Sequence, residues 1–131
     1  MNTLCLLYNI ILSVRMEQNL KVNIKKRDNY VIFYLIGQLD AHSAPQLEKE
    51  ISMLLDEKIQ ILVFNLSNLE YISSAGLGVF MSFIQDLREN NGDIIFTELN
   101  SRVENVMNLL GFNHIFKIYD TESEAVKQFA I

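Results

Sequence analysis

The chain has 131 residues, half of them apolar and 21% charged, and its formal net charge is −5 at pH 7. This length suits one domain with a real core, and the composition favours a folded globular protein over a disordered one. The negative charge disfavours nucleic-acid binding as the main function, because that needs clustered Lys and Arg. A single cysteine excludes an internal disulfide and suits a reducing compartment. Two histidines and one cysteine far apart give no metal-ligand spacing, so we expect neither a metal nor another cofactor.

The first 15 residues differ from the rest. The apolar run from Leu4 to Leu12 lacks both the positive start and the small-residue cleavage site of a signal peptide. It is also shorter than the roughly 20 apolar residues that span a bilayer. Met16 follows closely. We therefore expect residues 1–15 to be an extended start or a loose N-terminal tail, with a membrane-surface anchor as the alternative, and residues 16–131 to form a single domain.

The domain begins with a predicted hairpin. Apolar residues alternate with polar ones at Leu20, Val22 and Ile24, as in a strand with one solvated face. Asp28-Asn29 supplies a turn, and residues 31–36 are continuously apolar, as in a strand covered on both faces.

Helices and strands then alternate. Ser43 and Gln46 predict a capping box at the start of a helix, and Ser101 with Glu104 predicts another. Further strands are expected at residues 59–66, 94–96 and 115–119, and further helices from Ser73 or Ser74 to about residue 90, and over 101–110 and 121–129. This order predicts an α/β layered domain, in which right-handed crossovers make the later strands largely parallel.

The segment Ser73-Ser74-Ala75-Gly76-Leu77-Gly78 joins a predicted buried strand to a helix. Its serines lie where the first backbone N–H groups of the helix are unpaired and the helix dipole is positive. A phosphate, bound or covalently attached, would be stabilised there. The alternative is an ordinary N-cap serine followed by a glycine that eases a tight turn.

Two segments resemble the signature of the STAS domain family, specifically the bacterial anti-sigma-factor antagonists. They are the run from Asn65 to Gly78, and Gly37-Gln38-Leu39-Asp40 followed by Ser43-Ala44-Pro45. The resemblance covers residues 20–131. It implies a small mixed sheet of about five strands, with an opening hairpin followed by largely parallel strands, packed with about four helices.

The resemblance also implies a function in the bacterial cytoplasm. The dephosphorylated protein would bind an anti-sigma factor that is also a GHKL-type serine kinase, and so release a sigma factor. Serine phosphorylation would break the complex, and a PP2C-type phosphatase would restore it. The expected partners therefore include neither a nucleic acid nor a membrane.

The family pattern reads Asp-Ser-Ser/Thr-Gly-Leu-Gly, with the phosphate on the first serine. Aligned on the two glycines, Ser73 occupies the aspartate position, Ser74 the phosphorylated position, and Ala75 the next. The resemblance thus implies phosphorylation of Ser74, with Ser73 as the second choice. It implies a partner-binding surface made of Asp40, Ser73, Ser74, Ala75, Gly76 and Leu77. Asp40 has a second interpretation, as a residue that caps the following helix.

Other functions fit the sequence less well. A serine hydrolase needs a general base and usually a Gly-x-Ser-x-Gly elbow, whereas neither serine follows a glycine, and His42 and His114 are the only histidines. We therefore expect no enzyme activity. A phosphate loop would need a lysine after its glycines, so nucleotide binding is expected to be weak at most. Within the family, the alternative is a scaffold or phosphorelay partner that does not act on a sigma factor.

Overall fold

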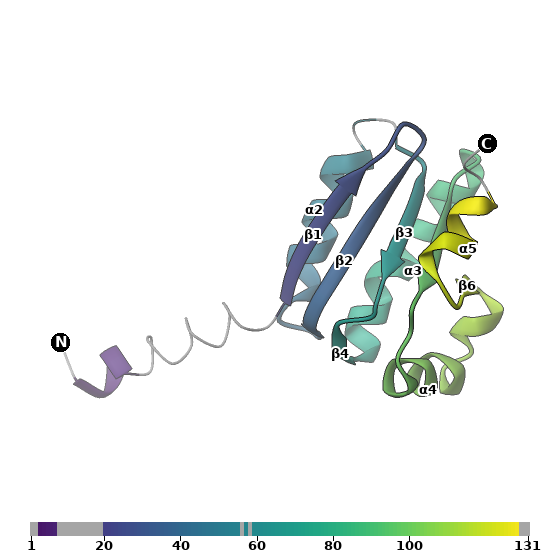
Figure 1. Cartoon of the computed structure of the whole chain (residues 1–131). Coiled ribbons are helices and arrows are strands. Elements are labelled where there is room, and N and C mark those ends of the chain that lie inside the picture. Colours follow the sequence, from purple (N-terminus) through teal and green to yellow (C-terminus); the bar gives the residue numbers. More distant parts are fainter. Residues whose placement is uncertain (1–2, 8–19, 56, 58, 129–131) are drawn as a thin grey trace.

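The computed structural model describes residues 3–7, 20–55, 57 and 59–128, and confirms the α/β architecture (Figure 1). Residues 3–7 are helical, and the rest of the expectation for residues 1–15 lies outside the described residues. From Leu20 on, the elements are β1 (Leu20–Lys26), β2 (Tyr30–Leu39), α2 (Ala44–Leu55), β3 (Ile61–Asn65), β4 (Leu69–Ile72), α3 (Ser74–Glu89), β5 (Asp93–Thr97), α4 (Ser101–Leu109), the 3₁₀ helix η1 (Phe112–His114), β6 (Lys117–Tyr119) and α5 (Glu122–Lys127).

The described strands form one six-stranded sheet in the order β1-β2-β3-β5-β6, with β4 also paired to β2. Strand β1 is antiparallel to β2 and every other pair is parallel, as the hairpin and the alternating elements predicted. Buried residues of α2, α3 and α4 pack on one face of the sheet. Helix α5 covers the other face, where it forms a smaller core cluster with residues of β2, β3 and β5. Figure 1 shows α5 on the opposite side of the sheet from α2 and α3.

Strand β2 pairs with two successive strands, and this arrangement determines where the turn at Ser73 lies. Its first half pairs with β3, and its second half pairs with β4 after a register shift beside Gly37. Gly37 has a φ of 104°, a backbone conformation that glycine adopts readily. Leu39, at the end of β2, pairs with Ile72, at the end of β4. The segments that follow these two residues therefore leave the sheet side by side.

Stacked phenylalanines fix α3 on the sheet. The rings of Phe33 and Phe64, from β2 and β3, are stacked with centroids 4.6 Å apart. Phe80 of α3 makes edge contacts with Phe64 at 4.9 Å and with Phe96 of β5 at 4.8 Å. All four rings are fully buried. Such edge-to-face contacts add to the free energy that burial of apolar area contributes.

Two predicted capping boxes were wrong. The Ser43 hydroxyl donates to the Gln38 carbonyl (2.9 Å) and accepts from the Asp40 N–H (2.9 Å), so it ties the end of β2 to the turn before α2. Helix α4 is capped one residue earlier than predicted, because the Asn100 side chain accepts from the Val103 N–H (2.9 Å). Thr121 caps α5, because its hydroxyl accepts from the Glu124 N–H (3.1 Å).

Candidate functional site

Helix α3 begins with a side-chain cap. Ser73 is the N-cap residue, and its hydroxyl accepts from the Gly76 N–H at 3.2 Å. The Ser73 N–H in turn donates to the Leu39 carbonyl at 2.9 Å, which joins the start of the helix to the end of β2. Serine suits this position because its short oxygen-bearing side chain satisfies an N–H that has no partner within the helix.

Gly76 lets the first turn of α3 lie directly on the end of β2. A Cβ built on this glycine would lie 2.7 Å from Leu39 Cγ and 2.7 Å from the Leu39 carbonyl oxygen. Both distances are far below ordinary van der Waals contact. Gly78, in the same helix, is exposed, and a Cβ there would meet no atom within 4 Å. Close packing therefore requires a glycine at position 76 and not at position 78.

The predicted site residues divide into an exposed and a buried group. Ser74, the first residue of α3, is exposed, and so is Ala75. Ser73 is half-buried. Gly76 is buried, and Leu77 is only 1% exposed and belongs to the core. The structure thus brings these residues together in one turn, with Ser74 and Ala75 forming its outer surface.

Asp40 lies in the neighbouring turn, one residue after Leu39. Its Oδ1 accepts from the N–H groups of His42 (3.0 Å) and Ser43 (3.2 Å). The Asp40 carbonyl accepts from the Ala44 N–H (2.8 Å), at the first residue of α2. The capping interpretation of Asp40 is therefore confirmed. Because Leu39 and Ile72 are paired, the Asp40 turn and the Ser73 turn leave the same edge of the sheet.

The hydrolase alternative finds no support in the geometry. Neither His42 nor His114 hydrogen-bonds to Ser73 or Ser74 among the described residues, and His114 lies in η1 after α4. No group of three or more His, Cys, Asp or Glu in the described ranges is placed to hold a metal ion. In the same part of the chain, every helix is too short or too polar to cross a bilayer.

A polar cluster on the α5 face was missed by sequence reasoning. Asn65, only 7% exposed, donates through Nδ2 to Glu98 (3.3 Å) and Glu122 (3.2 Å), and its Oδ1 accepts from the Ser67 N–H (3.0 Å). Burial, and then the hydrogen bond to Glu122, raise the pKa of Tyr34 to about 12. The one signal in the sequence was a polar Asn at the end of the apolar run that became β3. This cluster fixes the segment between β3 and β4, which leads to the Ser73 turn.

Comparison with known proteins agrees with this geometry. The sequence model of the STAS domain matches residues 21–125. BtrV of Bordetella bronchiseptica, which carries the name of an anti-sigma factor antagonist, is 33% identical over 84% of this chain and 95% of BtrV. The anti-sigma-B factor antagonist of Listeria monocytogenes is 26% identical over 81% of this chain and 94% of that protein.

Solved structures of SpoIIAA from Bacillus share the fold. The unphosphorylated form, described as an anti-sigma factor antagonist, superposes with a TM-score of 0.72 at 22% identity, covering 82% of this chain and 95% of that chain. The phosphorylated form gives a TM-score of 0.64 at 21% identity, covering 82% and 98%. These two structures show the shared fold, and the match of the STAS sequence model over residues 21–125 establishes that the chain belongs to the STAS domain family.

Proposed function

We propose that this protein is an anti-sigma factor antagonist, and that phosphorylation of Ser74 switches off its binding to an anti-sigma factor. The observation that carries the proposal is the position of Ser74. It is exposed and begins a 16-residue helix whose first turn is fixed against the end of β2. Both named relatives above bear the name of anti-sigma factor antagonists, which supports the same function for this chain.

Ser74 is a better phosphate acceptor than Ser73. The Ser73 hydroxyl accepts the Gly76 N–H, and a phosphate on it would disturb the cap of α3. The Ser74 hydroxyl makes no hydrogen bond within the described residues, and its side chain faces solvent. A kinase can therefore reach the Ser74 oxygen without unfolding the helix.

Ser73 also compensates in part for the aspartate of the family pattern. Aspartate and serine are comparable N-cap residues, because each offers an oxygen to an N–H of the first turn. Ser73 makes that bond with the Gly76 N–H. The helix start is thus capped without the aspartate, and what this turn lacks is a negative charge beside Ser74. We expect this difference to alter kinase recognition and not the fold.

A phosphate on Ser74 would act on the surface without refolding the domain. It would add about −1.5 to −2 charges and three acceptor oxygens at the positive end of α3, where a dianion is stabilised. A partner fitted to the uncharged turn would then meet a bulky anion, next to the turn that carries Asp40. Losing about 3–4 kcal/mol of binding free energy weakens an interface several hundred-fold, which suffices for a switch.

The proposed binding surface consists of the exposed Ser74 and Ala75 with the adjoining Asp40 and Ser73. Gly76 and Leu77 hold this surface in place from below. The proposed partners are an anti-sigma factor with GHKL-type serine kinase activity and a PP2C-type phosphatase. We place the protein in the cytoplasm and assign it a binding function, with no catalytic step of its own.

Purification of the protein from native cells, followed by intact-mass analysis, tests this function. We expect one added phosphate on the wild type and none on Ser74→Ala, together with recovery of a GHKL-type kinase in both cases. Ser82→Ala is the matched control, because Ser82 is an exposed serine two turns further along α3. Undiminished phosphorylation of Ser74→Ala would refute the site. Recovery of partners that lack any anti-sigma factor would instead favour a scaffold or another phosphorelay.

A further inference from the structure

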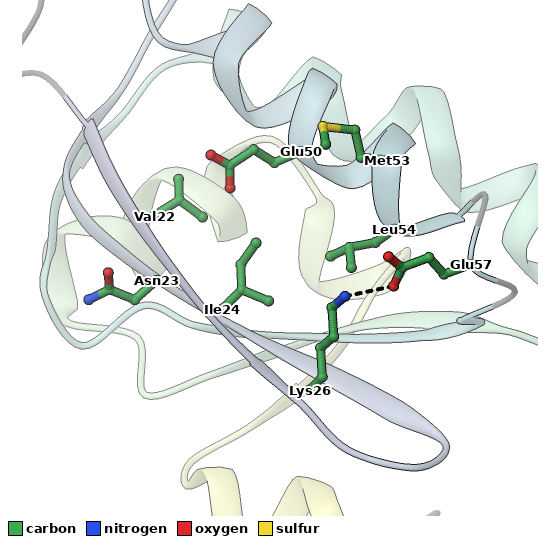
Figure 2. Close-up of a pocket in the computed structure, with 8 residues that line it drawn as sticks. All are labelled: Val22, Asn23, Ile24, Lys26, Glu50, Met53, Leu54 and Glu57. Carbon is green, nitrogen blue, oxygen red and sulfur yellow. Dashed lines mark hydrogen bonds and ion pairs between the residues drawn. The ribbon is translucent and has the colours of Figure 1, made fainter.

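An open groove lies between the edge strand β1 and helix α2, away from the Ser74 turn. Its volume is about 600 Å³, and Figure 2 shows the side chains around it. Val22 and Ile24 come from β1, and Met53 and Leu54 come from α2. Charged groups lie at its margin, including the Lys26–Glu57 ion pair (2.7 Å). The groove is therefore largely apolar with a charged rim.

The groove exists because α2 covers only part of β1. Along the inner face of this strand, exposure rises from 5% at Leu20, through half-buried Val22, to 39% at Ile24. On the helix, Leu54 is buried, whereas Met53 is 61% exposed. Ile24 and Met53 thus leave apolar surface in water, which burial would stabilise.

The same chain carries a second uncovered apolar surface. In the helical residues 3–7, Leu4 is 72% exposed, and Leu6 and Leu7 are each 50% exposed. The first charged side chain in the sequence is Arg15, so this segment brings no side-chain charge into an apolar groove. Exposed leucine side chains on one short helical segment form an apolar surface that water disfavours.

The chain between the helical residues 3–7 and strand β1 is long enough for the two apolar surfaces to meet within one molecule. Residues 8–19 separate Leu7 from Leu20, the first residue of β1. At about 3.3 Å per residue this connection spans up to roughly 40 Å, whereas β1 itself spans only about 23 Å. The segment can therefore reach any point of the groove.

We propose that the N-terminal segment docks into this groove of its own chain, with Leu4, Leu6 and Leu7 packing against Ile24 and Met53. Docking removes both apolar surfaces from water at once. The proposal does not depend on the function assigned to Ser74.

The only cysteine of the chain offers a direct test. Cys5 is exposed and lies between the leucines, so a nitroxide spin label attached to it reports where the segment spends its time. In the full-length protein labelled with ¹⁵N, we expect loss of the amide signals of Ile24 and Met53 relative to the reduced label. The amide of Leu109, the last residue of α4, should keep its intensity, because α4 lies away from β1 and α2 (Figure 1).

Matched variants separate docking from chance proximity. Met53→Glu places a charge in the groove and should restore the lost signals. Met81→Glu changes another exposed methionine, on α3, and should leave the signal loss unchanged. A second label position, Cys5→Ser with Thr3→Cys, should reproduce the pattern if the first label does not itself cause the docking.

Two results would overturn the proposal. One is full signal intensity at Ile24 and Met53 with both label positions. The other is signal loss that appears when spin-labelled protein without ¹⁵N is mixed with unlabelled ¹⁵N protein. That second result would assign the groove to the segment of another copy.

Discussion

The packing of Gly76 against β2 gives a prediction whose size can be worked from the structure. In Gly76→Ala, the new methyl group would lie 2.7 Å from both Leu39 Cγ and the Leu39 carbonyl oxygen. Reaching ordinary contact at 3.4 Å requires a shift of about 3.4 − 2.7 = 0.7 Å between the helix start and the strand. Because one of the two atoms belongs to the backbone, a side-chain rotation cannot relieve the overlap.

Three terms set the expected change in the free energy of unfolding. Overpacking costs about 1–3 kcal/mol. The shift also weakens the hydrogen bond from the Ser73 N–H to the Leu39 carbonyl, at about 0.5–1.5 kcal/mol. The better helix propensity of alanine returns about 1 kcal/mol. We therefore expect Gly76→Ala to lose roughly 0.5–3.5 kcal/mol, with a central value near 2 kcal/mol.

Gly78→Ala is the matched control in the same helix. A Cβ at position 78 meets no atom within 4 Å, so only the propensity term applies, and stability should rise by about 1 kcal/mol. Urea unfolding followed by circular dichroism measures both changes. At about 3–4 °C per kcal/mol, the two melting temperatures should differ by about 10 °C. Equal stability of the two variants would refute the close packing of α3 on β2.

Two further predictions concern the polar cluster on the α5 face. Asn65→Ala should lower the free energy of unfolding in urea by about 1–3 kcal/mol, because the hydrogen bonds of a buried side chain are lost. Asn68→Ala, at an exposed position, is the control and should change this free energy little. Equal losses in the two variants would contradict the role of the cluster. Tyr34, whose pKa is raised to about 12, should give a late ionisation step in an absorbance titration at about 295 nm, and Tyr34→Phe should lack that step. Between about pH 10 and 12 the unfolded state has lost this proton and the folded state keeps it, so stability should fall with rising pH, and less steeply in Tyr34→Phe. A titration curve with the same late step in Tyr34→Phe as in the wild type would contradict this.

Elements with a strong local pattern were predictable. The apolar run that contains β3 and the helical spacing after Ser73 each depend on residues close in sequence, and α3 begins and ends close to the predicted residues. The end of α3 was also predictable, since Asn91 adopts the left-handed conformation, with a φ of 66°, that Asn-Gly sequences favour.

Strand β4 was not predictable from its own residues. It has only four, and the two central ones, Glu70 and Tyr71, are exposed. It forms because β2 is long enough to pair beyond β3, once the register shifts beside Gly37. A contact with β2 also explains why the predicted capping box at Ser43 was wrong. The Ser43 hydroxyl donates to the Gln38 carbonyl near the end of β2 instead of capping α2.

The position of the candidate site was predictable from the sequence, but the separate roles of its two serines were not. The pattern around Gly76 predicted a helix start with two serines. Only the structure assigns the cap to Ser73 and the exposed hydroxyl to Ser74. The contact between Asn65 and Glu122 joins residues 57 positions apart, so no local pattern indicated it.

The affinity of the anti-sigma factor for this protein, with and without a phosphate on Ser74, tests the proposed switch most directly. Protein carrying phosphoserine at position 74 alone, and the unmodified protein, would each be titrated calorimetrically with the GHKL-type partner recovered from cells. We expect the phosphate to weaken binding at least about a hundredfold, equivalent to roughly 3 kcal/mol. Equal affinity for the two forms would contradict it.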